Sequence, residues 1–451
     1  MDKYGNPEQA GNLDWGDTSY EEALTYLSNL TKFGINLGLD RIKELLSRVD
    51  NPERKLRVVH VGGTNGKGST SIMIAEILER AGYKVGLFTS PHLHDYRERI
   101  TINGEMIPKN EVVHLVDCLK PHLESLVQSG VEHPTEFEVS TAMAFMYFAR
   151  ERVDFAVIEV GLGGEIDSTN VVNPLIAVIT NVGMDHMDYL GQDLRSIAAV
   201  KAGIIKTGTQ LITASDRPEV LEVIESRAED LKVPVWKVGE QVRWEKRWAG
   251  ELEQKFDLFG LYSIYEKLTL RLIGDHQLKN AATAVTACEV LTREYGIEIP
   301  REAIYRALKE VQWPGRLELI SLRPKVLLDG AHNVDGAIVL AKALPLYQRK
   351  RLILCLGMLS DKEREKVVEL LVPFADEVII TRANSPRAGN WTYLAEIVRR
   401  YNQPVYTIEN PRDAVNFGLN LLESDDMLCI TGSLYMIAEA REEILRLKKL
   451  R

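Results

Sequence analysis

A glycine-rich segment between a predicted strand and a predicted helix carries the clearest chemical signal in the sequence. It runs Val61-Gly62-Gly63-Thr64-Asn65-Gly66-Lys67-Gly68-Ser69. Glycines let a backbone wrap around a phosphate chain, the start of a helix offers free N–H donors, and Lys67 can reach the outer phosphates. The segment predicts a nucleotide phosphate site. The alternative is a glycine-rich turn that binds no ligand.

This segment departs from the common phosphate-binding loop at one position. In that loop the lysine is followed directly by Ser or Thr, whose hydroxyl binds magnesium. Here Gly68 stands in that place. A metal ion therefore needs a hydroxyl from elsewhere, or it uses Ser69 in a shifted geometry.

Polar residues also follow two other apolar runs. Glu159 closes the run FAVIEV, and Asp185-His186 follow the run LIAVITNVG. Groups at the carboxyl edge of a parallel sheet are well placed to bind a metal or a substrate, and oxygen ligands suit magnesium. His186 alone also fits a structural histidine, but its position at a strand end favours metal or phosphate. His92 and His94 alternate as zinc ligands do, but they lack a neighbouring third ligand, so zinc is not predicted.

Two further residues, Lys201 and Arg316, allow two interpretations each. Lys201 lies among small and apolar residues, where a lysine either extends its charge to solvent or is held near metal ions. Arg316 either swings onto phosphate oxygens or makes a salt bridge or helix-cap contact. Asp329 and His332, in Leu328-Asp329-Gly330-Ala331-His332-Asn333, are again polar groups just past an apolar strand.

The elements that must position these residues alternate between strand and helix. Helical spacing of apolar residues predicts helices at Ser69–Arg80 and Glu138–Arg150, and Asn103-Gly104 predicts a hairpin with a type I′ turn. Residues 240–273 predict a small antiparallel addition. Strand–helix alternation predicts right-handed crossovers and a doubly wound sheet. The strands expected in it are Arg57–Val61, Lys84–Thr89, Phe155–Val160, Leu175–Thr180 and Gln210–Thr213.

A second α/β unit is expected after Gln312-Trp313-Pro314-Gly315-Arg316, which we interpret as a junction that interrupts a helix. The fold class predicted is α/β: a doubly wound, mainly parallel sheet domain with a phosphate-binding loop, residues 1–313, then a smaller Rossmann-like domain, residues 314–451. The strands expected in the second domain are Lys325–Leu328, Arg351–Leu356, Glu377–Ile380, Pro404–Ile408 and Met427–Thr431.

Composition narrows the class of protein. The 451 residues carry a net charge of −10, which argues against a nucleic-acid binder. The four cysteines form no C-x-x-C motif and fit a reducing compartment. The N-terminal stretch MDKYGNPEQAGNLDWGD has no apolar core, so no signal peptide is expected, and no apolar run is long enough for a membrane span. A cytoplasmic protein without a membrane partner is predicted.

Many of these segments together resemble folylpolyglutamate synthase and dihydrofolate synthase, of the Mur ligase superfamily. The resemblance extends from Leu37–Ile42 to Gly432–Tyr435. It rests on the order and spacing of the motifs GTNGKGS, TSPHL, ERITING, TEFE, EVGLGG, DSTNVV, DHMDYLG, KAGIIK, HQLKNA, PGRLE and DGAHN.

The resemblance implies ATP and two magnesium ions as cofactors. Ser90 of TSPHL would supply the missing hydroxyl and, with Glu159, hold the first magnesium, while His186 would help to hold the second. Lys201 matches a family lysine that is carbamylated. Catalytic roles then fall to Lys67, Lys201, His186, Asp329 and His332. The nucleotide contacts implied are Gly63, Thr64, Asn65, Gly66, Lys67, Gly68, Ser69, Asn280, Arg316 and Asp329.

The resemblance also implies the substrates: dihydropteroate, reduced folates and L-glutamate. His332 and Ser433 would lie near the incoming glutamate. Two departures from relatives are Val334 in place of a proline and Ser168 in place of an alanine. We expect Val334 to adjust the loop without abolishing function, and Ser168 to have little consequence. The pterin end would meet Leu37, Gly38, Thr135, Glu136, Phe137, Glu138, Ile166, Asp167 and Ser168.

The expected activity is ATP-dependent addition of L-glutamate to dihydropteroate, to the γ-carboxylate of reduced folates, or to both, through an acyl phosphate. A monomer is the default expectation. Two other functions fit parts of the sequence. One is a Mur-type ligase that adds an amino acid to a cell-wall precursor. The other is a nucleotide-dependent switch that makes no product, although the guanine-reading motif N-K-x-D is absent.

Overall fold

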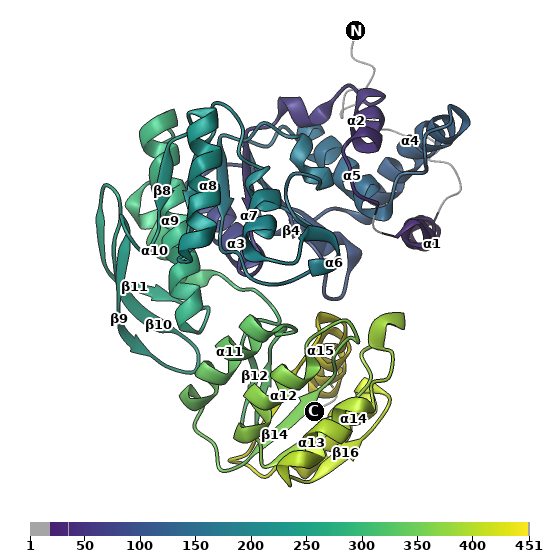
Figure 1. The fold of residues 1–451 in the computed structure, drawn as a ribbon, viewed down its shortest axis with the longest axis vertical. Helices are drawn as coiled ribbons and strands as arrows, with labels where there is room; N and C mark the ends of the chain where they lie inside the picture. The colour runs from purple at the N-terminus through teal and green to yellow at the C-terminus, as the bar shows by residue number, and fades with distance from the viewer. Residues whose placement is uncertain (1–18, 35, 450–451) are drawn as a thin grey trace.

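A computed structural model describes residues 19–34 and 36–449. The stretch for which no signal peptide is expected, residues 1–17, lies outside that range. Two bodies are visible in Figure 1: an upper one, coloured purple to green, and a lower one, coloured green to yellow. Each is built around its own sheet. Within the described range, every helix is too short or too polar to cross a membrane.

The first sheet has eight strands in the order β4-β3-β2-β5-β1-β6-β7-β8. The six strands from β2 to β8 are parallel, and β3 and β4 are antiparallel. All five predicted strands are present. The strands are β1 Val58–Gly62, β2 Val85–Phe88, β3 Ile100–Ile102, β4 Glu105–Met106, β5 Phe155–Glu159, β6 Ile176–Ile179, β7 Gln210–Thr213 and β8 Val235–Lys237.

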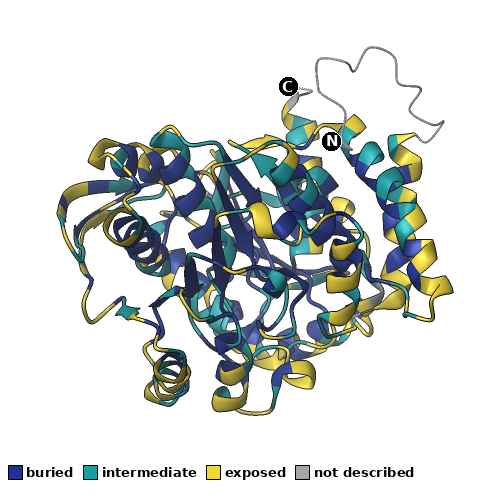
Figure 2. Ribbon diagram, turned by 90° about the horizontal axis from the view of Figure 1, so that it is seen from above, coloured by how far each residue is buried: buried dark blue, intermediate teal, exposed yellow. Residues whose placement is uncertain are grey.

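Helices cover both faces of this sheet, which is why its central strands are apolar throughout. In β1, Val59 and Val61 face the cluster of α3, α9 and α10, whereas Val58 faces the cluster of α1, α2, α4 and α5. Figure 2 shows the buried strands at the centre. The helices are α1 Tyr20–Asn29, α2 Asp40–Ser47, α3 Lys67–Arg80, α4 Lys109–Gln128, α5 Glu136–Arg150, α6 Met187–Leu190, α7 Leu194–Ala202, α8 Pro218–Leu231, α9 Asp275–Tyr295 and α10 Arg301–Glu310.

Two smaller predictions are confirmed. Asn103 and Gly104 both have positive φ, at 48° and 73°, as a type I′ turn between β3 and β4 requires. The segment 240–273 forms a separate antiparallel sheet next to α9 and α10. Its strands are β9 Arg243–Ala249, β10 Gln254–Phe259 and β11 Ile264–Leu270.

The second sheet has the order β12-β13-β17-β14-β15-β16. All five predicted strands are present, and helices pack on both faces: α11, α12 and α13 on one, α14 and α15 on the other. The strands are β12 Glu318–Leu322, β13 Lys325–Leu328, β14 Leu352–Leu356, β15 Glu377–Ile380, β16 Val405–Thr407 and β17 Met427–Thr431, and the helices are α11 Val334–Ala343, α12 Arg364–Leu371, α13 Tyr393–Val398, α14 Pro411–Leu421 and α15 Leu434–Lys449.

The structure corrects the predicted organisation in one respect. Residues 312–316 do not interrupt a helix, since α10 ends at Glu310 and the chain turns into strand β12. The edge strands β8 and β12 are present in addition to the predicted strands. Their residues are half-exposed, so they lack the continuous apolar pattern that marked the central strands. The division into domains at 313/314 stays a prediction.

Candidate active site

The glycine-rich loop connects β1 to α3 and is tied to the end of strand β6. The Thr64 amide donates to the Asn181 carbonyl at 3.0 Å, and the Asn65 amide donates to the Asn181 side chain at 2.8 Å. Gly66 has a φ of +82° and directly precedes α3. The first N–H groups of a helix have no acceptor within it, so those of α3 can bind a ligand at the loop. Lys67 folds back over the loop and donates to the carbonyls of Gly63 and Thr64. This is the geometry of a phosphate site.

The structure explains why Gly68 replaces the hydroxyl residue of the common loop. A Cβ atom at Gly68 would lie only 2.9 Å from the indole of Trp313, at the junction between the two bodies. A serine there would clash with that ring. Ser69, the other candidate, is buried and accepts a hydrogen bond from Gln277 of α9 at 3.2 Å. Asn280, one turn further along α9, lies against Gly66.

Ser90 and Glu159 lie together because β2 and β5 are neighbours in the sheet. The Ser90 amide donates to a Glu159 carboxylate oxygen at 3.1 Å. Burial raises the pKa of Glu159, and the main charge opposing that shift is Lys67. A buried carboxylate and a hydroxyl beside the phosphate loop are suitable ligands for magnesium. The described residues form no cluster of three or more His, Cys, Asp or Glu side chains, so such an ion would need phosphate oxygens and water as well.

Lys201, on α7, also reaches the phosphate loop. Its ammonium nitrogen lies 3.0 Å from the Gly63 carbonyl oxygen, and its side chain is buried. Burial, with Lys67 as a second cause, lowers the pKa of Lys201 to about 7. Gly164 allows this approach, because a Cβ there would lie 2.6 Å from the Val200 carbonyl oxygen. The structure thus favours a lysine held at the site over one extended to solvent.

Asp185 connects the two bodies directly. One of its carboxylate oxygens lies 2.8 Å from the ammonium of Lys362, and the other accepts from Asn333 at 3.1 Å. Burial alone would raise the pKa of Asp185, but Lys362 and His186 outweigh it and lower that pKa. His186 is partly exposed beside it, and burial lowers its own pKa. Asn333 also donates to Asn65 at 3.3 Å, so this contact lies at the phosphate loop.

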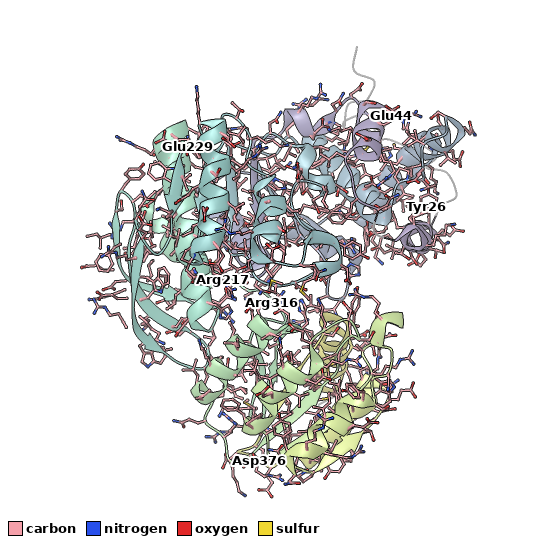
Figure 3. All side chains as sticks on the ribbon, in the orientation of Figure 1. Tyr26, Glu44, Arg217, Glu229, Arg316 and Asp376 are labelled. Atoms are coloured by element: carbon pink, nitrogen blue, oxygen red, sulfur yellow. The ribbon has the colours of Figure 1, made fainter. Side chains whose placement is uncertain are left out.

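The second body brings further predicted residues to the same junction. The Asp329 carboxylate accepts from the amides of Leu317 and Ala331. Burial raises the pKa of Asp329, and Arg316 partly offsets this. Figure 3 shows Arg316 where the two bodies meet. His332 donates through Nδ1 to the Gly330 carbonyl at 2.8 Å when that nitrogen carries the proton, and Ser433 is buried near the start of α15.

The residues predicted for the pterin end fall into two groups. Gly38, which follows Leu37, is tied to Ile166 by an amide-to-carbonyl bond at 3.5 Å, and Asp167 and Ser168 continue that segment. Phe137 packs against Gly161, and Glu136 pairs with Arg99 at 3.1 Å. Thr135 and Glu138 form the capping box of α5, and Glu138 also pairs with Arg41. The structure therefore gives Thr135 and Glu138 local structural partners.

Sequence reasoning missed several residues at this junction. Lys362 follows strand β14 in a segment with no glycine motif, and Trp313 was noted only as part of a junction. Asn181 was passed over, although it lies at the end of an apolar strand like Glu159, and that position could have marked it. Lys362 had no such signal, since its partner Asp185 is distant in sequence.

Two protein-family models match the chain: the Mur ligase middle domain over residues 61–288, and the Mur ligase glutamate ligase domain over residues 315–434. The dihydrofolate synthase/folylpolyglutamate synthase of Bacillus subtilis is 40% identical, over 95% of this chain and 99% of its own. The chain belongs to the folylpolyglutamate synthase/dihydrofolate synthase family. It is accordingly an ADP-forming ligase of the Mur type.

Solved structures of this family agree with the fold. Folylpolyglutamate synthase of Mycobacterium tuberculosis complexed with ADP has a TM-score of 0.86 and 32% identity, covering 94% of this chain and 98% of its own. FolC of Escherichia coli in complex with DHPP and ADP has a TM-score of 0.84 and 29% identity, covering 96% and 99%. The resemblance inferred from the motifs is thus confirmed over the whole length of a folylpolyglutamate synthase/dihydrofolate synthase.

Proposed function

We propose that this ligase adds L-glutamate both to dihydropteroate and to the γ-carboxylate of reduced folates. One observation carries the proposal: Lys67 and Lys201 approach the same glycine-rich loop, and both donate to the Gly63 carbonyl. Lys67 also lies close enough to Glu159 to oppose the rise that burial causes in the pKa of that carboxyl. The dual acceptor range is supported by the B. subtilis and E. coli relatives, which carry both activities in their names.

The proposed reaction has two steps. The acceptor carboxylate attacks the γ-phosphorus of ATP, so ADP leaves and an acyl phosphate forms. The glutamate amine then attacks the acyl carbon, the C–O bond to phosphate breaks, and the amine loses a proton as the amide forms. A carboxylate is a poor acyl donor, and phosphorylation supplies the leaving group. Positioning and charge stabilisation account for most of the rate.

Each part of the junction has a place in this reaction. Lys67 and the α3 amides would hold the nucleotide phosphates, and Asn280, Arg316 and Asp329 would make further contacts with ATP. His332 and Ser433 would receive the incoming glutamate. Contact between the two bodies would exclude water, which otherwise hydrolyses an acyl phosphate. The pterin end would lie along the segments of Gly38, Phe137 and Ile166–Ser168.

Two magnesium ions are part of the proposal. Ser90 and Glu159 would hold one, and His186 would help to hold the other. Bound magnesium supplies positive charge that neutralises the phosphoryl group during transfer. The chemistry of Glu159 fits this role, since it is a buried carboxylate with a hydroxyl residue beside it.

We also propose that Lys201 is carbamylated. Carbamylation needs a neutral amine, and a pKa of about 7 provides one at neutral pH. The modification would convert a buried cation, placed near Lys67, into an anion able to bind metal. It would thereby remove the repulsion between two lysines at one loop.

We also propose that the enzyme is a cytoplasmic monomer that binds no nucleic acid, with its domains divided at residues 313/314. The free cysteines Cys118, Cys288, Cys355 and Cys429 fit a reducing compartment, and the net charge of −10 opposes binding to nucleic acid.

The test is ATP-dependent phosphate release with magnesium and glutamate, comparing dihydropteroate, tetrahydrofolate and no acceptor. We expect release with both acceptors and only background release without one. Release with tetrahydrofolate alone would remove dihydropteroate from the proposal. If neither acceptor stimulates release while ATP still binds, the folate assignment is wrong.

A further inference from the structure

A buried histidine in the centre of the first sheet is not explained by the nucleotide site. His60 lies in β1 between Val59 and Val61, is fully buried, and faces the side of the sheet opposite to α3. Its Nε2 atom lies 2.8 Å from the hydroxyl of Thr169, which is also fully buried. Its Nδ1 atom is buried and has no hydrogen-bond partner among residues 19–34 and 36–449. An apolar residue would fill this position without leaving a polar atom unpaired.

The direction of the hydrogen bonds follows from the donors available. The Thr169 hydroxyl has one proton and donates it to Oδ1 of Asp167, a carboxyl whose two oxygens also accept backbone N–H groups. Burial raises the pKa of Asp167, and these donated hydrogen bonds oppose that shift. The bond between His60 and Thr169 must then be donated by His60, with the proton on Nε2. This assignment leaves Nδ1 without a proton, which agrees with the absence of a hydrogen-bond partner for that atom among the described residues. The three side chains form one chain of donors that ends on Asp167.

Asp167 is held from both sides. Its Oδ1 also accepts from the Thr169 amide at 3.0 Å, and its Oδ2 accepts from the Leu162 amide at 2.7 Å. The carboxylate therefore links the short 3-10 helix Ser168–Val171 to the loop that follows β5. That loop leads to Gly164, which packs on Lys201. The same segment contacts Gly38 through Ile166.

We propose that His60 and Thr169 are positioning residues for the pteroyl acceptor, acting by fixing the Asp167 carboxylate and the segment Ile166–Ser168. The inference rests on the proposed function, which assigns that segment to the pterin end. His60 does not touch substrate in this scheme. Its neutral ring supplies the hydrogen bond that keeps the Thr169 proton directed at Asp167. Burial lowers the pKa of His60 to about 3, which agrees with a ring that stays neutral.

The test compares two substitutions at Thr169 in the full-length enzyme. Thr169→Val has nearly the same shape but no hydroxyl, whereas Thr169→Ser keeps the hydroxyl. We expect Thr169→Val to raise the KM for dihydropteroate by about tenfold, with kcat and the KM for ATP close to wild type, and Thr169→Ser to keep the wild-type KM. A split between acceptor KM and the other constants is not expected from a general loss of packing.

A second pair covers the case in which Thr169→Val does not fold. His60→Gln keeps an N–H donor and His60→Met removes it, so only His60→Met should raise the acceptor KM. The inference is wrong if donor-free variants keep the wild-type acceptor KM, if they raise the KM for ATP equally, or if Ser and Gln fail as Val and Met do. The proposed function fails differently, because wild type itself would then show no acceptor-dependent phosphate release.

Discussion

The ammonium of Lys362 lies 2.8 Å from the carboxylate of Asp185, and this ion pair joins the two bodies of the ligase beside the phosphate loop. Both side chains are about nine-tenths buried. Removing one partner should therefore destabilise the fold more than it would in a surface salt bridge, because the other charge is left buried and uncompensated. The pair also places a lysine of the second body next to His186.

Replacing this lysine is the first prediction. Lys362→Met should lower the thermal midpoint and destabilise the fold by about 3 kcal/mol, since Asp185 keeps its charge without its cation. We also expect kcat to fall by roughly tenfold or more, because the two bodies lose a contact at the reaction centre. Thermal unfolding and steady-state phosphate release measure the two effects. Lys366→Met is a matched control, because Lys366 is exposed and its salt bridge is to Glu363, three residues away on the same surface. Unchanged stability and rate in Lys362→Met would contradict the role of the pair.

The second prediction concerns the charge of Lys201. Lys201→Ala should reduce kcat by about 10²-fold or more, because the proposed carbamate could no longer form at this position. If the side chain is carbamylated, formate or acetate should restore part of the activity to this variant. Isotopically labelled bicarbonate should give a carbamate NMR signal in wild type that is missing in Lys201→Ala. Wild-type enzyme without that signal would exclude carbamylation.

The pH dependence of this modification is a third prediction. Burial lowers the pKa of Lys201 from its usual 10.5 to about 7, so the fraction of neutral amine increases as pH rises through 7. Enzyme stripped of carbon dioxide should regain activity on addition of bicarbonate more completely at pH 8 than at pH 6. The unmodified enzyme should also gain stability between about pH 7 and 10.5, since the unfolded chain binds the extra proton there. Recovery that is independent of pH would argue against an amine with a lowered pKa.

Gly68 provides a fourth prediction. Gly68→Ser restores the hydroxyl of the common phosphate loop, yet its Cβ would lie 2.9 Å from the ring of Trp313. Overpacking of this kind costs about 1–3 kcal/mol, so we expect the KM for ATP to rise by roughly tenfold. The double variant Gly68→Ser with Trp313→Leu should recover part of that loss. If Gly68→Ser alone binds ATP as well as wild type does, the ring is not what excludes a side chain.

Glu159 provides the fifth prediction. Glu159→Gln keeps the size of the side chain and removes its charge, so the magnesium concentration needed for half-maximal rate should rise by about tenfold or more. A magnesium titration at saturating ATP measures this. Glu165→Gln is a control on the neighbouring loop, since Glu165 is exposed. An unchanged magnesium requirement in Glu159→Gln would remove this carboxylate from the metal site.

Local patterns in the sequence were enough to predict the central strands, the hairpin and the phosphate loop. A strand buried on both faces is apolar throughout, and a type I′ turn needs residues such as Asn103 and Gly104 that accept positive φ. Because parallel strands end at one edge of the sheet, Glu159 and Asp185 could also be placed near the loop. Family resemblance added Ser90, which no local pattern marked.

Only the tertiary structure decided which distant residues meet. Lys362 and Asp185 lie in loops of different bodies, Gly68 meets Trp313 at the junction, and His60 reaches Asp167 through Thr169. The first two contacts depend on how the two independently packed bodies meet. The third depends on which segment packs on the face of the sheet that carries His60. A residue's own neighbours in sequence fix its backbone conformation. They do not fix the partner that packing brings from far along the chain.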